Sequence, residues 1–174
     1  MTAEPDRYED SSTRVLSIVD LLERYGRPRA FRLVFSNGVF DLLHRGHVAS
    51  LEAARGFGDR LVVALNSDES ARRLKGPGRP VQPAADRARI LAALRCVDAV
   101  TIFDDDTPAA LIERLLPDVL VKGADYEIEQ IAGARAVLDA GGEVRLIELE
   151  AGRSTSDLVR RIQDSALRDA GASE

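Results

Sequence analysis

Two histidines, His44 and His47, are the only imidazole side chains in this chain of 174 residues. They lie three positions apart, with Gly46 between them, shortly after an apolar run. An imidazole can donate a hydrogen bond to a phosphate oxygen in its neutral or its protonated form. A glycine lets a ligand approach the backbone closely, and a helix that begins here would add free N–H groups. The spacing therefore favours a phosphate-binding turn.

Two other interpretations of the histidines stay open on the residues alone. A zinc site needs a third ligand, and the chain has no further histidine and only one cysteine, Cys96. Asp41 could serve as that ligand, although three ligands within one turn give poor tetrahedral geometry. Alternatively, both rings are partly buried, hydrogen-bonded residues that only support the fold.

The segments that must position these residues alternate between apolar runs and helical patterns. Apolar residues at helical spacing from Val15 to Tyr25 predict a leading helix. We expect strands over residues 31–35, 61–65, 97–103, 118–122 and 143–149, with helices between them. This alternation predicts an α/β fold, a Rossmann-like, doubly wound, five-stranded parallel sheet with an extra N-terminal helix. Ligands of such sheets bind beyond the carboxyl ends of the strands, where the polar segments of this chain occur.

The composition limits the classes of protein to which the chain can belong. We expect one domain over residues 12–165, with flexible tails at 1–11 and 166–174. The net charge of -5 argues against nucleic acid as a partner. There is no apolar run of about 18 residues, so we expect no membrane partner. The acidic, polar N-terminus is unlike a secretory signal, which predicts a cytoplasmic protein.

Six ordered motifs give the chain a specific resemblance. The stretch GVFDLLHRGH is similar to the signature of the cytidylyltransferase-like nucleotidyltransferases, which carry an HxGH motif. Within that superfamily the chain resembles the heptose 1-phosphate adenylyltransferases. From about Phe35 to Ile162, the stretches that carry the resemblance are FSNGVFDLLHRGH, GDRLVVALNSD, RRLKGPGRPVQP, VKGADY, IAG and GRSTSDLVRRI.

The resemblance implies transfer of AMP from ATP to a heptose 1-phosphate, giving ADP-heptose and pyrophosphate. Such chemistry needs positioning and charge stabilisation, and Mg²⁺ is expected because it offsets the triphosphate charge. The implied partners are ATP, heptose 1-phosphate, a separate sugar kinase and a second copy in a homodimer. Two alternatives remain: a cytidylyltransferase acting on a small phosphorylated alcohol or sugar, and a non-catalytic nucleotide-binding module.

The same resemblance implies a role for each candidate site residue. His44, His47 and Lys75 are implied as catalytic groups, and Asn66, Asp68 and Arg79 as contacts of the sugar phosphate. Asp41 either binds Mg²⁺ or holds its loop by accepting backbone N–H groups. Glu148 stands where many cytidylyltransferases place an arginine, and Arg153 is expected to replace that contact. Nucleotide and phosphate contacts are implied for Ser36, Asn37, Gly38, Val39, Phe40, Asp41, Gly46, Arg87, Lys122, Gly123, Asp125, Arg153, Ser154, Thr155 and Ser156.

Overall fold

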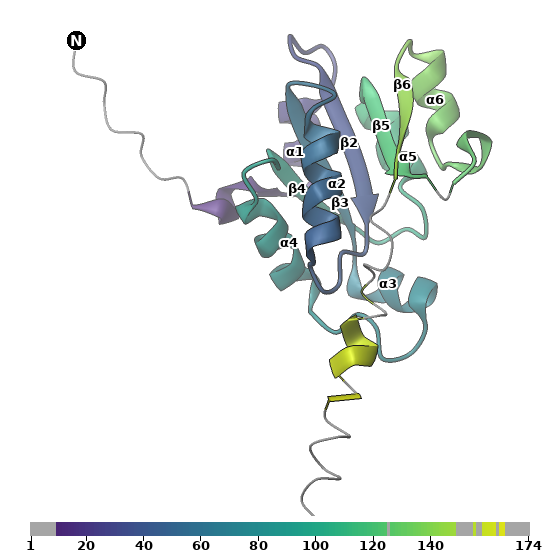
Figure 1. Ribbon diagram of the computed structural model, residues 1–174. Helices are drawn as coiled ribbons and strands as arrows, with labels where there is room; N and C mark the ends of the chain where they lie inside the picture. Colours follow the sequence, from purple (N-terminus) through teal and green to yellow (C-terminus); the bar gives the residue numbers. More distant parts are fainter. Residues whose placement is uncertain (1–9, 125, 149–154, 156–157, 163, 166–174) are drawn as a thin grey trace, which may run out of the picture.

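Six parallel strands form the centre of the protein in the computed structural model, which describes residues 10–124, 126–148, 155, 158–162 and 164–165 (Figure 1). Their order across the sheet is β1-β4-β3-β2-β5-β6. The α/β class is therefore confirmed, and the predicted count of five strands was wrong by one. The strands are β1 (Val15–Leu16), β2 (Leu33–Gly38), β3 (Arg60–Asn66), β4 (Ala99–Phe103), β5 (Val119–Gly123) and β6 (Glu143–Ile147).

The additional strand is β1, in a segment where we predicted helix. Ser17 ends this strand and caps the helix that follows, because its hydroxyl accepts a hydrogen bond from the Asp20 N–H at 3.1 Å. Val15 pairs instead with Val100 of β4 at the sheet edge. The leading helix therefore starts at Ile18 rather than at Val15.

Helices cover both faces of the sheet (Figure 1). One face packs against α1 (Ile18–Tyr25), α5 (Ala109–Leu115) and α6 (Ala134–Asp139). The other packs against α2 (Arg45–Arg55) and α4 (Ala84–Ala93). One more helix, α3 (Asp68–Lys75), follows the carboxyl end of β3. The 3-10 helices are η1 (Ser11–Arg14) and η2 (Ile128–Gln130), and residues 1–9 of the predicted tail lie outside the described residues.

Alternation along the central strands builds two separate cores. In β2, Leu33 and Phe35 point to the face of α1 and α5, whereas Val34 points to the face of α2 and α4. In β3 the whole run from Leu61 to Asn66 is buried. A strand with helices on both faces needs such a continuous apolar sequence, as the run LVVAL predicted.

The order of the strands reverses around β2. β3 and β4 extend the sheet on one side of this strand, while β5 and β6 extend it on the other. β2 continues to Gly38, three residues beyond the predicted end at Phe35, because Ser36, Asn37 and Gly38 still pair with β3. These three residues are thus the carboxyl end of the central strand, next to the switch point where ligands of such sheets bind.

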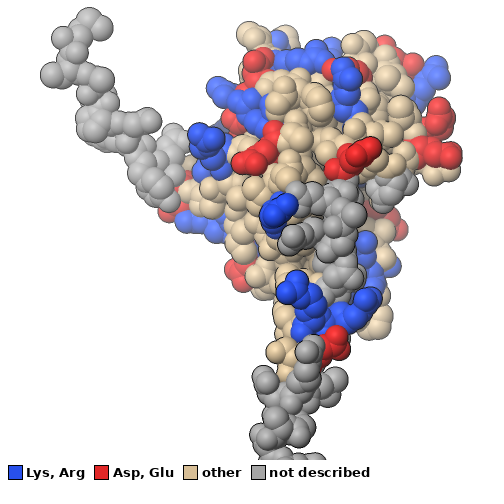
Figure 2. Space-filling model, in the orientation of Figure 1, with Lys and Arg blue, Asp and Glu red and all other residues tan. Residues whose placement is uncertain are grey.

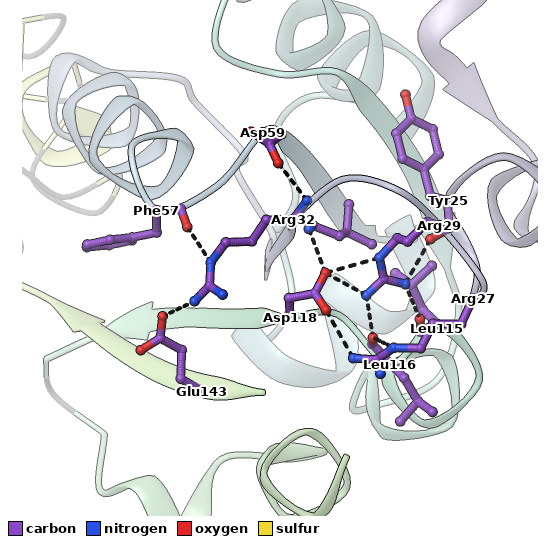
Figure 3. Close-up of polar contacts among 11 residues, drawn as sticks. Tyr25, Arg27, Arg29, Arg32, Phe57, Asp59, Leu115, Leu116, Asp118 and Glu143 are labelled. Atoms are coloured by element: carbon purple, nitrogen blue, oxygen red, sulfur yellow. Dashed lines mark hydrogen bonds and ion pairs between the residues drawn. The ribbon is translucent and has the colours of Figure 1, made fainter. Parts of the chain in front are cut away.

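Ion pairs join the amino ends of the strands (Figure 3). The Asp118 carboxylate accepts hydrogen bonds from Arg27 at 3.0 Å, from Arg29 at 2.9 Å and from the Leu33 N–H at 2.8 Å. The Arg29 side chain is 4% exposed and also donates to the carbonyls of Leu115 and Leu116. Burial alone would raise the pKa of Asp118, but the Leu33 N–H and the two guanidinium groups hold that pKa below 3.8.

Among the described residues, no helix is both long enough and apolar enough to cross a membrane. The predicted C-terminal helix falls partly outside these residues; positions 155, 158–162 and 164–165 are helical. The predicted tail at 166–174 lies outside them altogether.

Candidate active site

A cavity of about 770 Å³ lies at the carboxyl ends of the strands, which is the end of the sheet that the sequence indicated. Its volume is typical of a small-molecule site. Figure 2 shows Lys and Arg side chains gathered at the lower end of the face drawn, where Figure 1 places α3 and the helical residues 158–162. The predicted site residues that line the cavity are Ser36, Asn37, Gly38, Val39, Phe40, Asp41, His44, Gly46, His47, Asn66, Lys75, Arg79, Lys122, Gly123 and Thr155.

The turn from β2 to α2 forms one wall of this cavity. Phe40 lies in this turn with a φ of 45°, in the left-handed region that an aromatic residue rarely adopts. Its ring covers Gly38 so closely that a Cβ there would lie 3.0 Å from the ring. The ring also meets His47 edge-on, with a centroid distance of 5.2 Å. The strained turn therefore brings an aromatic support against one of the two imidazoles.

The two histidines stack on each other at the start of α2. Their ring centroids are 3.8 Å apart and their planes differ by 20°. His44 is the N-cap residue of the helix, and His47 lies in its first turn. In both rings Nδ1 is buried, and both residues line the cavity.

Burial and the neighbouring His44 lower the pKa of His47 from 6.5 to about 4. The ring is therefore neutral at pH 7 in the absence of a ligand. A proton on Nε2 gives it one hydrogen-bond donor toward the cavity. Phosphates bound there would favour the protonated form and raise this pKa again.

Asp41 anchors the loop that follows α3. Its Oδ1 accepts the N–H groups of Val81 at 2.8 Å and Gln82 at 3.0 Å, and its Oδ2 pairs with Arg79 at 2.7 Å. These contacts hold the loop, which is one of the two roles that we expected for Asp41. Because both carboxylate oxygens are already engaged and Asp41 is 2% exposed, the residue does not fit a magnesium ligand. Nor do the described residues place three His, Cys, Asp or Glu side chains together around a metal ion.

Lys75 is the last residue of α3 and lines the cavity. Its side chain is exposed and makes no hydrogen bond or ion pair with the described part of the chain. Gly76 and Gly78 follow with φ values of 88° and 81°, which a glycine adopts without strain. The lysine therefore presents an unpaired cation on a glycine-rich connection beside the histidine pair.

Arg87 and Asp68 are not among the residues that line the cavity, although we expected both there. The Arg87 side chain is 0% exposed and pairs with Asp68 at 2.6 Å. It also donates to the carbonyls of Val39 at 2.5 Å and Gln82 at 2.9 Å. Arg87 therefore holds the β2–α2 turn and the loop after α3 together from inside the protein. It does not face the cavity where a phosphate would bind.

The other side of the cavity follows β5. Lys122 and Gly123 end this strand, and the Lys122 ammonium lies 5.4 Å from the centre of the Tyr126 ring. Such a cation–aromatic pair offers a flat surface and a positive charge to a ligand. Asp125, Arg153, Ser154 and Ser156 lie outside the described residues, so their predicted contacts stay predictions.

Residues 35–161, more than half of the chain, match the family described as cytidylyltransferase-like. The chain belongs to this family. The bifunctional protein HldE of Mesorhizobium japonicum is 60% identical over 129 residues, which are 74% of this chain and 26% of that protein. The bifunctional protein HldE of Geotalea uraniireducens is 49% identical over 167 residues, 96% of this chain and 34% of that protein. The chain thus spans about a quarter to a third of these relatives.

A solved structure supports the fold of this cytidylyltransferase-like chain. The lipopolysaccharide core biosynthesis protein from Thermoplasma volcanium GSS1 is 24% identical and superposes with a TM-score of 0.56. The match covers 70% of this chain and 98% of that one. At this identity the likeness concerns the architecture alone.

Sequence reasoning missed one wall of the cavity in this cytidylyltransferase-like chain. Asp106, Thr107 and Pro108 line it from the segment that follows β4. The signal was present, because the run DDDTP directly follows a predicted strand, as the other polar site segments do. Gln130 also lines the cavity and was missed, and no pattern in the sequence distinguishes it from an ordinary surface residue.

Proposed function

We propose that this chain transfers AMP from ATP to a heptose 1-phosphate and releases ADP-heptose and pyrophosphate. The stacked pair of His44 and His47 at the start of α2, where both residues line the cavity, carries this proposal. Its support also includes the motifs that resemble the heptose branch and the identity of 60% to a relative named HldE.

In the proposed reaction, a phosphate oxygen of the sugar attacks the α-phosphorus of ATP. The bond from that phosphorus to the oxygen bridging to the β-phosphate breaks, and pyrophosphate leaves with the electron pair. His44 and His47 donate hydrogen bonds to phosphate oxygens as negative charge builds on them. The free N–H groups at the start of α2 add to this stabilisation. The side chains position the reactants and form no covalent intermediate.

The remaining groups are assigned by their place around the cavity. Lys75 neutralises phosphate charge from the end of α3, and the Lys122–Tyr126 pair faces the nucleoside. Since no described carboxylate cluster fits a metal ion, we propose that Mg²⁺ is bound by the phosphates of ATP. Supply of the acceptor by a sugar kinase, pairing of two copies of the chain and a cytoplasmic location belong to the same proposal.

Pyrophosphate release tests the proposed reaction. The four common nucleoside triphosphates are each supplied with heptose 1-phosphate, and separately with glycerol 3-phosphate and a panel of other sugar phosphates. We expect release with ATP and heptose 1-phosphate, together with ADP-heptose as the product. Turnover with CTP and not with ATP would move the chain to the cytidylyltransferase alternative. ATP binding without release on any acceptor would instead identify a non-catalytic nucleotide-binding module.

A further inference from the structure

Asn66, at the carboxyl end of β3, is a deeply buried polar side chain on the cavity wall. It is 3% exposed and lines the cavity beneath α3. Its Nδ2 donates a hydrogen bond to the Ser70 hydroxyl at 2.9 Å. The Ser70 hydroxyl in turn donates to the Asp105 carbonyl at 2.9 Å. A buried amide held in this way has a defined direction.

The chain of hydrogen bonds fixes which end of the amide faces the cavity. A serine hydroxyl has one proton, and Ser70 uses that proton on the Asp105 carbonyl. Ser70 can therefore only accept from Asn66, which places the amide nitrogen toward Ser70. The Oδ1 of Asn66 is left as the free end, and it makes no hydrogen bond with the described residues.

An amide oxygen at this place selects for a particular kind of ligand group. It accepts hydrogen bonds and donates none, whereas a phosphate at neutral pH offers oxygens that also accept. Facing a phosphate, Asn66 Oδ1 would be repelled and would remain without a donor, which is costly for a buried group. A sugar hydroxyl is the complementary partner because it supplies a proton.

Two arginines of the neighbouring segments are already paired with carboxylates. Asp106, which follows β4, pairs with Arg73 at 2.6 Å, and Arg79 pairs with Asp41 at 2.7 Å. Beside Asn66 the cavity therefore presents acceptors, including the Asp106 carboxylate. The donors from His47 and Lys75 belong to the part that would hold phosphates. We therefore expect hydroxyls and phosphates to occupy separate parts of one cavity.

We propose that Asn66 Oδ1 accepts a hydrogen bond from one hydroxyl of the acceptor sugar and is a specificity-determining residue. The inference rests on the proposed function and deepens it. It assigns the expected contact of Asn66 with the sugar phosphate to the polyol part of that molecule. Ser70 acts through Asn66 as a positioning residue, since its hydroxyl sets the direction of the amide.

The test combines enzyme variants with acceptors that each lack one hydroxyl. In the wild type, one particular deoxy position should lower kcat/KM about 10- to 100-fold. In Asn66→Ala, kcat/KM for the full acceptor should fall by a similar factor, and the same deoxy position should have almost no further effect. The other deoxy positions should keep their wild-type effects, and the KM for ATP should stay the same. Ser70→Ala should weaken discrimination at the same position without changing the KM for ATP.

Thr101→Val is the matched control, because Thr101 is buried in the adjacent strand β4 and does not line the cavity. Thermal unfolding of all variants separates loss of recognition from loss of folding. If the wild type uses the acceptor but no deoxy position couples to Asn66, or if Asn66→Ala raises the KM for ATP as much as that for the sugar, the assignment of Asn66 is overturned and the proposed function stands. If the wild type turns over no phosphorylated polyol, both are overturned.

Discussion

The two ends of the central sheet treat polar groups in opposite ways. At the amino ends, Asp118 and the buried Arg29 satisfy each other and nearby backbone groups within the protein. At the carboxyl ends, Lys75 and the Oδ1 of Asn66 have no partner among the described residues, and His47 lines the cavity. A buried polar group without a partner costs stability, so its place on a cavity wall favours a ligand that completes it. The comparison teaches that one edge stabilises the fold while the other is built for binding.

Removing an imidazole from the carboxyl edge gives the largest expected effect. His47→Ala deletes one donor to the phosphates, and we expect kcat to fall about 100- to 1,000-fold. The KM for ATP should change much less, because the donor matters most as charge builds during the reaction. Steady-state kinetics measure both. Equal losses in kcat and in ATP affinity would mean that the ring holds the ground state or the fold instead.

Removing a carboxylate from the amino edge should have the opposite pattern. Asp118→Ala leaves the buried Arg29 guanidinium without its counter-charge, and we expect the free energy of unfolding to fall by about 3 kcal/mol. At a temperature where the variant is folded, its kcat should equal that of the wild type. Urea unfolding and kinetics on one preparation check both statements. Asp139→Ala is the control, since it removes a carboxylate from the exposed pair with Arg135 and should leave stability unchanged.

A smaller catalytic effect is expected at the end of α3. Lys75→Ala removes an exposed cation from the cavity, and we expect kcat/KM to fall about 10- to 100-fold, as for a charged hydrogen bond. Arg72→Ala removes the same charge from the same helix, away from the cavity, and should have little effect. Similar losses in both variants would show that only the general positive field of α3 matters.

The last expected effect is a pH dependence of stability that arises at the carboxyl edge. Folding lowers the pKa of His47 to about 4, whereas the unfolded chain titrates near 6.5. Between these values the unfolded chain takes up a proton that the folded protein does not. The unfolding free energy should therefore decrease as pH falls, by about 2 kcal/mol between pH 7 and pH 5. Urea unfolding should show this decrease in the wild type and a weaker one in His47→Gln. An equal slope in both proteins would contradict the assignment to His47.

The sequence was sufficient to predict the features that repeat locally. The apolar run of β3, the turn around the two histidines and the polar segments after the strands all indicated a parallel sheet with a site at its carboxyl edge. Each of these signals depends on neighbouring residues and on a period that burial imposes. The class of the fold and the position of the cavity follow from such signals.

What the sequence could not supply depends on contacts between distant residues. The two residues of β1 form a strand only because Val100 lies beside Val15. Arg87 has the pattern of an exposed helix residue, yet the carbonyl of Val39 and the carboxylate of Asp68 draw it inside. The direction of the Asn66 amide likewise depends on the Asp105 carbonyl, through Ser70.

The attachment of Arg79 to Asp41 limits how the glycine-rich connection can move. Only Gly76, Pro77 and Gly78 separate Lys75 from that attachment, so the fully stretched span measures no more than about 14 Å. A connection of this length does not allow Lys75 to move far from the Arg79–Asp41 pair. We therefore expect substrates to enter and pyrophosphate to leave while Lys75 stays near the cavity. Backbone rotations at Gly76 and Gly78 would shift Lys75 only slightly.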